Sequence, residues 1–227
     1  MNNSSTALTP GEVFFVTGEY TYFFGTILVM FFLFLCKCLR FNWILAYLIG
    51  FGFGLIWEVT HSLLGDSFLS LVNPNIYRYI SRFVYPVLHA GADGTIFVGI
   101  FAIIVNCLVP LCFKRTRILS VEDKLTFCPC SILALMVSLY LMQEFFFELA
   151  FNSKVWFYSA NVTWNPVAYK IGNIPYTIIP LAEWVVFGFL YWVSMFFVFN
   201  TSELSCTSCC CRKRIEPTLY QYTYFDV

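Results

Sequence analysis

Long apolar stretches alternate with short polar segments along most of the chain. Five stretches stay apolar over about 20 residues or more, the length that an α-helix needs to cross the hydrocarbon core of a membrane. They cover residues 22–41, 43–64, 83–113, 126–151 and 174–199. The pattern predicts an all-α, polytopic membrane protein, a bundle of five transmembrane helices.

The composition supports this fold class. Of the 227 residues, 59% are hydrophobic and 11% are charged, whereas roughly 25% are charged in an ordinary soluble domain. The spans leave an N-terminal segment, 1–21, and a C-terminal tail, 200–227, and neither is long enough for a soluble domain. Any function must therefore come from the helices and short loops in contact with the lipid bilayer. Nothing in the chain favours nucleic-acid binding.

Basic residues predict the orientation of the bundle. Nine Lys and Arg residues fall on one side of the predicted membrane and four on the other, and the richer side is normally cytosolic. This places the N-terminus outside the cell or in the lumen and the C-terminal tail in the cytosol, in a plasma or secretory-pathway membrane. The nine are Lys37, Arg40, Lys114, Arg115, Arg117, Lys124, Arg212, Lys213 and Arg214.

Glycosylation sequons agree with this orientation. Acceptors of the form Asn-x-Ser/Thr occur at Asn2, Asn3 and Asn161, all on the predicted outer side, where glycosylation takes place. A fourth sequon, at Asn200, falls on the predicted cytosolic side and is expected to stay unmodified.

The cysteines favour lipidation over disulfide bonding. All ten lie at the predicted cytosolic ends of spans or in the tail, where thiols stay reduced. Four of them precede a basic triplet in the tail, an arrangement typical of S-palmitoylation beside anionic headgroups. Three consecutive cysteines suit a tetrahedral zinc site poorly. The predicted palmitoylation sites are Cys206, Cys209, Cys210 and Cys211.

The end of the tail carries two short interaction motifs. Residues 222–225 have the tyrosine-x-x-hydrophobic form of a sorting signal that an adaptor binds. The last residues, Phe225, Asp226 and Val227, fit a PDZ-type groove that captures a free carboxylate. A tail without either partner is the alternative interpretation.

Ionisable residues gather at one depth of the predicted bundle. Given alternating helix directions, four spans place such residues in the outer half of the membrane, and the inner halves contain only Asn106 as a comparable polar group. No Lys or Arg is expected in this layer. Its members are Glu58, His61, His89, Asp93, Glu144, Glu148 and Glu183.

Their spacing predicts one shared site. Glu58 and His61 are three residues apart, and the pairs His89–Asp93 and Glu144–Glu148 are four apart, so each pair lies on one helical face. Lipid cannot satisfy such faces, which must meet one another or a water-filled cavity. So many neighbouring carboxyls cannot all ionise, and several are expected to hold protons unless a cation is bound.

Three functions are compatible with this layer. The first is an enzyme that acts on a lipid-like substrate by general acid–base chemistry. The second is a small proton or cation channel or transporter. In the third, the groups only hold the helices of a non-catalytic scaffold together. We rank transport below catalysis because the inner halves of the spans provide no continuation of a polar path.

A metal centre is a further alternative. Glu58-x-x-His61 is half of the carboxylate–histidine arrangement of di-iron bundles, and His89 and Asp93 offer two more ligands. A second Glu-x-x-His is missing, and the chain has only two His. A zinc or di-metal site therefore ranks below a metal-free acid–base site, and the sequence fixes no cofactor.

The predicted orientation can be tested with glycans. After expression in mammalian cells, enzymatic deglycosylation is expected to shift the gel mobility through Asn161 or the N-terminal sequons. Asn200→Gln, the control, is expected to leave the glycosylated band unchanged. A glycan at Asn200 contradicts the orientation.

Overall fold

A computed structural model describes residues 9–64, 70–72, 75–158, 163 and 165–200. Five of its helical segments are long and apolar enough to cross a membrane, which points to a membrane protein. The first two are α1 (Pro10–Leu35) and α2 (Phe41–Leu64). The third runs from α3 (Tyr85–Ile103) through the π-helical turn η3 (Ile104–Leu108) into α4 (Val109–Cys112). The last two are α6 (Pro129–Phe151) and α7 (Ile178–Asn200).

Short elements join these helices. A 3-10 turn, η2 (Ile76–Arg78), precedes α3, and η4 (Lys114–Ile118) and α5 (Val121–Phe127) connect α4 to α6. Strands β1 (Ser70–Val72) and β2 (Trp156–Tyr158) pair antiparallel, as do β3 (Val167–Ile171) and β4 (Ile174–Thr177). Gly172, with φ 60°, provides the positive φ that the tight turn between β3 and β4 needs.

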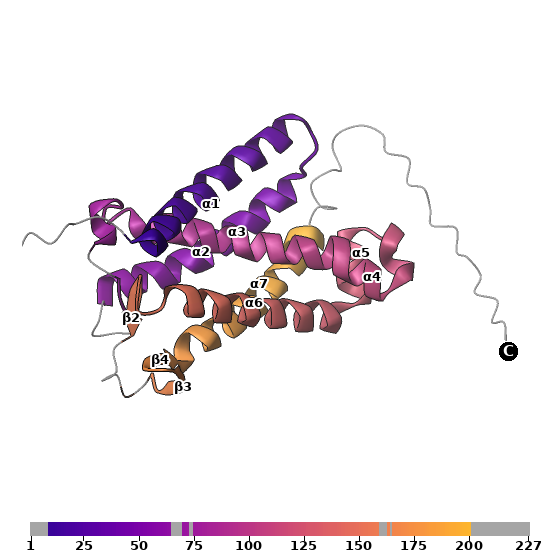
Figure 1. The fold of residues 1–227 in the computed structure, drawn as a ribbon. Coiled ribbons are helices and arrows are strands. Elements are labelled where there is room, and N and C mark those ends of the chain that lie inside the picture. The colour runs from indigo at the N-terminus through magenta and orange to yellow at the C-terminus, as the bar shows by residue number, and fades with distance from the viewer. Residues whose placement is uncertain (1–8, 65–69, 73–74, 159–162, 164, 201–227) are drawn as a thin grey trace, which may run out of the picture.

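The helices run from one end of the bundle to the other (Figure 1). We call the end with β2, β3 and β4 the strand end, and the opposite end the α5 end. The described part of the chain begins at the strand end with α1, and α7 finishes near the α5 end. The outside location of the N-terminus stays a prediction.

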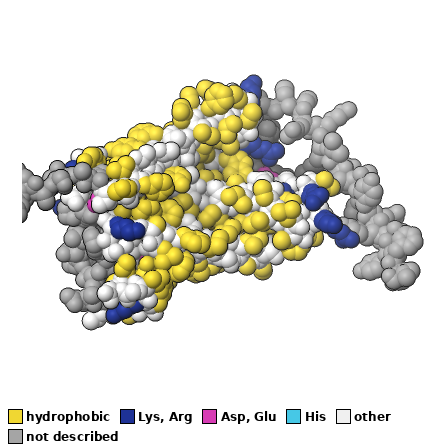
Figure 2. Space-filling view, in the orientation of Figure 1, with side chains coloured by type: hydrophobic (Ala, Val, Ile, Leu, Met, Phe, Trp, Pro, Cys, Tyr) yellow, Lys and Arg dark blue, Asp and Glu magenta, His cyan; other side chains and the backbone are white. Residues whose placement is uncertain are grey.

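The surface agrees with a position in a bilayer. Figure 2 shows hydrophobic side chains over the middle of the helical body, with Lys and Arg near its two ends. Side chains such as Phe32, Ile56 and Phe197 are exposed over 60% of their surface or more. Apolar exposure on this scale is typical of helices that face lipid.

Two segments differ from the sequence prediction. The first helix begins at Pro10 rather than near residue 22, because Thr9 and Glu12 form a capping box: each side chain hydrogen-bonds the other residue's backbone amide. The fifth helix begins at Ile178, since residues 174–177 form β4. The two antiparallel strand pairs are likewise absent from the all-helical prediction. As a consequence, Glu12 and Glu19 belong to a spanning helix rather than to an outer segment.

Glycines allow α2 and α3 to pack closely. A Cβ atom at Gly94 would lie 2.9 Å from the Phe51 backbone nitrogen, and one at Gly50 would lie 2.8 Å from Phe97 Cβ. Backbones can approach this closely only where a side chain is missing. The α2–α3 contact therefore sets the frame on which the polar groups are held.

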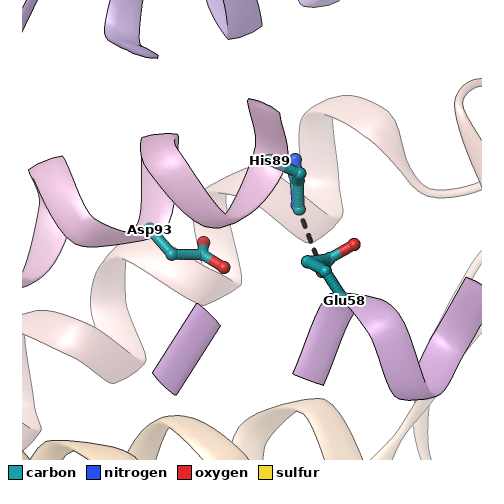
Figure 3. Close-up of side chains that lie close together, drawn as sticks. All are labelled: Glu58, His89 and Asp93. Atoms are coloured by element: carbon teal, nitrogen blue, oxygen red, sulfur yellow. Dashed lines mark ion pairs between the residues drawn. The ribbon is translucent and has the colours of Figure 1, made fainter. Parts of the chain in front are cut away.

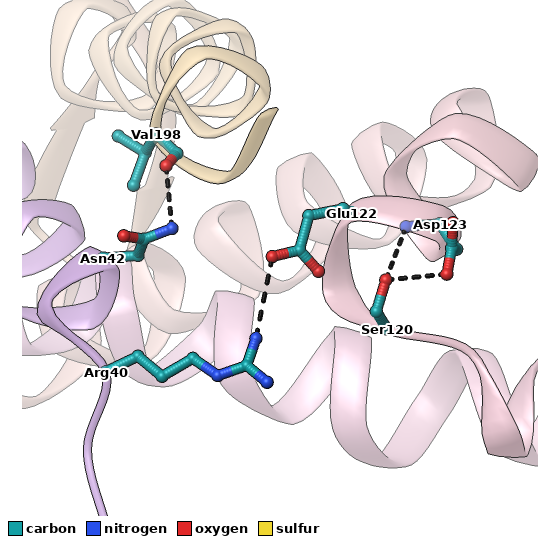
Figure 4. Close-up of polar contacts among 6 residues, drawn as sticks. All are labelled: Arg40, Asn42, Ser120, Glu122, Asp123 and Val198. Atoms are coloured by element: carbon teal, nitrogen blue, oxygen red, sulfur yellow. Dashed lines mark hydrogen bonds and ion pairs between the residues drawn. The ribbon is translucent and has the colours of Figure 1, made fainter. Parts of the chain in front are cut away.

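Polar contacts tie the α5 end together (Figure 4). Asn42 Nδ2 donates to the Val198 carbonyl at 2.9 Å, which joins the start of α2 to the end of α7. Ser120 caps α5 by accepting from the Asp123 amide at 3.1 Å. The Arg40–Glu122 ion pair, 3.8 Å long and largely exposed on the Arg side, contributes little stability.

Close packing of α2 and α3 generates a stability prediction. Gly94→Ala is expected to lower the free energy of unfolding by about 1–3 kcal/mol, because the methyl group meets backbone atoms that cannot turn away. Gly99→Ala on the same helix is the matched control, since a Cβ there meets nothing within 4 Å. Thermal unfolding in detergent measures both, and equal stability of the two variants contradicts the packing argument.

Candidate functional site

A cavity of about 600 Å³ lies between the five spanning helices in the half near the strand end. All seven residues predicted from the sequence line it, so four helices do bring their ionisable groups to one place. The remaining wall is mainly aromatic. Rings on this wall include Phe15, Trp57, Tyr85, Phe147, Trp156 and Trp184.

Glu19 on α1 is a further member of the site. Its Oε1 lies 2.7 Å from His89 Nδ1, and its side chain is only 4% exposed. Phe23 follows one turn later on the same face and packs where Gly91 of α3 carries no side chain. The absence of a Cβ at Gly91 therefore lets α1 approach α3 and brings Glu19 to His89.

Glu58, His89 and Asp93 form the most compact group of the cavity. Figure 3 shows Glu58 of α2 facing His89 and Asp93 of α3, with 3.6 Å between Glu58 Oε1 and His89 Nε2. One ligand atom from each of the three residues lies within 4.8 Å of the other two. Gly54 makes room for this arrangement, because a Cβ there would be 2.8 Å from Asp93 Oδ2. The imidazole also stacks on Tyr85, with ring centroids 5.5 Å apart.

The opposite wall carries Glu144, Glu148 and Glu183. Glu148 accepts hydrogen bonds from Asn152 Nδ2 at 2.9 Å and from Trp156 Nε1 at 3.1 Å, which ties β2 to the end of α6. Glu144 is buried and hydrogen-bonded with Trp184 and Glu148. Glu183 is partly exposed. Glu148 thus holds β2 against α6, and Glu144 and Glu183 line the cavity beside it.

His61 has different surroundings from those that its spacing predicts. It lines the cavity on the same helix as Glu58, but its ring lies against Trp57, with centroids 3.6 Å apart. The histidine grouped with Glu58 is His89, from another helix. The half motif Glu58-x-x-His61 is therefore not the ligand group that the structure assembles.

Aromatic rings close the cavity toward the α5 end. We call this group the aromatic floor: Phe97 lies with ring centroids 5.0–5.1 Å from Tyr140, Trp184 and Tyr191, and Phe53 lies 5.5 Å from Phe187. Between this floor and the α5 end, the described parts of the spanning helices carry no Asp, Glu, Lys, Arg or His. Asn106 there donates to its own helix, at the Ala102 carbonyl.

One basic residue reaches the cavity from outside the spanning helices. Arg82, which is exposed just before α3, contributes to the cavity lining, as does Tyr77. The pKa of the Tyr77 hydroxyl is raised first by burial; Arg82 opposes this shift and Glu58 adds to it. The loop before α3 therefore brings one cation to the edge of an otherwise acidic cavity.

Several predicted modification sites lie outside the described residues. These are the sequons at Asn2, Asn3 and Asn161, and the tail with Cys206, Cys209, Cys210, Cys211 and both interaction motifs. The six cysteines that the structure does describe are free thiols: Cys36, Cys38, Cys107, Cys112, Cys128 and Cys130.

Comparisons of the chain with protein-family models, with curated proteins and with solved structures found no match. The function is therefore argued from the chemistry and geometry of the cavity.

The hydrogen bonds that Glu148 accepts are expected to stabilise the fold. Glu148→Gln leaves one acceptor oxygen in place of the two that now bind donors from Asn152 and Trp156. The free energy of unfolding is therefore expected to fall by about 1–3 kcal/mol. Glu183→Gln is the matched control, since Glu183 lines the same cavity but is less buried. Thermal unfolding in detergent compares the two. An equal loss in both variants, or none in Glu148→Gln, contradicts the structural role.

Proposed function

We propose that this protein is an integral membrane enzyme that acts on a lipid or other hydrophobic substrate by acid–base chemistry. The observation that supports this most is the amphiphilic cavity, in which carboxyl and imidazole groups face a wall of aromatic rings inside a membrane bundle. Apolar cavities with a few convergent polar groups are the usual form of small-molecule sites. The aromatic wall suits a hydrocarbon chain or ring system, and the polar groups suit its head.

The cavity wall reaches the surface of the bundle between α1 and α6. Phe14 and Tyr22 of α1 and Phe146 of α6 line the cavity and are also exposed by 70%, 48% and 59% of their surface. Residues exposed on spanning helices face the hydrocarbon of the bilayer. A lipid substrate therefore has a route into the site from the membrane itself.

Proton-transfer groups occupy two walls of the cavity. On one wall Glu19 holds His89 through Nδ1, which leaves Nε2 directed at the interior. On the other wall, Glu144 and Glu183 present carboxyl groups. A substrate head between them has a proton donor on one side and an acceptor on the other, the arrangement that general acid–base catalysis needs.

Transport of protons or cations is the weaker interpretation. A conducting path needs polar groups or water across the whole membrane. The aromatic floor and the apolar core beyond it, with Phe101, Ile104 and Met136 fully buried, interrupt such a path. A purely structural role does not explain why the polar groups surround a cavity of this size.

Deuterium exchange tests the proposal without a known substrate. Purified protein is incubated in D₂O with a total membrane lipid extract, and lipids are compared by mass spectrometry. Wild-type protein is expected to change the mass or the deuterium content of a lipid species. Glu144→Gln and Glu183→Gln are expected to slow this change by about 10²–10⁴-fold, because they remove proton-transfer groups.

Glu122→Gln is the control, because Glu122 lies on α5 at the far end of the bundle. It is expected to retain the wild-type rate. A lipid extract that wild-type protein leaves unaltered, or a change that proceeds equally in the Glu144 and Glu183 variants, contradicts the proposal.

A further inference from the structure

We propose that Glu58, His89 and Asp93 bind one divalent transition-metal ion, with Zn²⁺ as the best-suited ion, in a site that opens into the cavity. The inference rests on the proposed function, since it assigns a cofactor to the same cavity.

The distance between Glu58 and His89 is the first argument. At 3.6 Å, Oε1 and Nε2 are too far apart for a hydrogen bond, which normally spans about 2.7–3.2 Å. Two ligands on one zinc ion, each about 2.0–2.2 Å from the metal, stand about 3.4 Å apart in tetrahedral geometry. The Asp93 carboxylate belongs to the same group, within 4.8 Å. Glu58 and His89 are thus spaced as ligands of one ion rather than as hydrogen-bond partners, and Asp93 lies close enough to complete the group.

The second argument is the support that His89 receives from Glu19. Glu19 accepts the Nδ1 proton at 2.7 Å, so the lone pair of Nε2 is left for a ligand. Histidines that bind metals usually donate their other ring nitrogen to a carboxylate in this way, which fixes the ring and raises its basicity. Glu19 itself lies on α1, outside the group of three.

Burial and charge give the third argument. Glu58 and Asp93 are only 6% and 8% exposed, and Glu19 Oε2 is buried without a hydrogen bond among the described residues. Three buried carboxyls around one imidazole are costly unless a cation offsets their charge. A divalent ion between Glu58, His89 and Asp93 provides that charge at the centre of the group.

The ligand set indicates the kind of ion and its task. An imidazole nitrogen beside carboxylate oxygens is compatible with zinc and related transition metals, whereas Ca²⁺ and Mg²⁺ prefer oxygen ligands alone. Three protein ligands leave a fourth position toward the cavity, as in catalytic sites. There the ion can bind and polarise an oxygen of the substrate head. Because His89 Nε2 binds the ion, proton transfer is left to Glu144 and Glu183 on the opposite wall.

Metal binding is measured on the full-length protein in detergent after chelator treatment and dialysis. Elemental analysis after Zn²⁺ loading is expected to give about one ion per chain, and Co²⁺ is expected to develop the visible absorption of a four-coordinate site. Asp93→Asn and Glu58→Gln are expected to weaken Zn²⁺ binding by at least about 100-fold. Glu19→Gln is expected to weaken it by about 10–100-fold, the usual effect of losing a partner of a ligating histidine.

His61→Gln is the matched control, because His61 lines the same cavity outside the ligand group. It is expected to keep the wild-type affinity, and a large loss there would instead support the Glu58-x-x-His61 motif and contradict the assignment. Zn²⁺ is also expected to raise the unfolding temperature of the wild type and not of Asp93→Asn, which tests the site even where one variant folds poorly.

Wild-type protein that takes up neither Zn²⁺ nor Co²⁺ in stoichiometric amount overturns the metal site. So does an affinity that Asp93→Asn, Glu58→Gln and Glu19→Gln all leave unaltered. These outcomes do not depend on a substrate. If lipid conversion in D₂O persists in metal-free protein, the proposed function stands and the catalytic task of the ion fails.

Discussion

A carboxyl group inside a membrane bundle needs a polar partner, and this requirement organises half of the structure. Glu19 meets it through His89, and Glu148 meets it through Asn152 and Trp156. The first contact joins two helices that are distant in the sequence, and the second joins the end of α6 to strand β2. The cost of an unmatched charge in a low-dielectric region thus fixes which helices become neighbours.

Small residues make these contacts geometrically possible. Gly54 leaves space for Asp93, and Gly91 leaves space for Phe23, so α2 and α1 can both approach α3 at the level of the polar group. The rings of the aromatic floor fill the bundle beneath it. The cavity is therefore bounded by tight packing on one side and by the paired strands of the strand end on the other, and its polar groups stay at one depth.

The sequence alone was sufficient to predict the spans and most of the residues that line the cavity. Helical periodicity places His89 over Asp93 and Glu144 over Glu148, and the length of a span sets their depth, so their meeting followed from simple geometry. The contribution of Glu19 could not be predicted in this way. Glu12 and Glu19 make residues 10–21 too polar to be recognised as part of a membrane span by their hydropathy. The choice of His89 rather than His61 as the partner of Glu58 depends on how α2 and α3 rotate against each other. Likewise, β1 and β2 pair residues from separate loops, which no local pattern reveals.

The Glu19–His89 contact also bears on how the protein is made. The two residues are 70 positions apart in the chain, and a ribosome that adds about 5–20 residues per second needs about 4–14 s to extend from one to the other. During that interval Glu19 has no imidazole to contact, and deep insertion of α1 would leave a carboxylate unmatched in hydrocarbon. Since Glu19 lies in the first half of α1, a shallow position keeps it hydrated. Helix α1 is thus expected to reach its final depth only when α3 arrives.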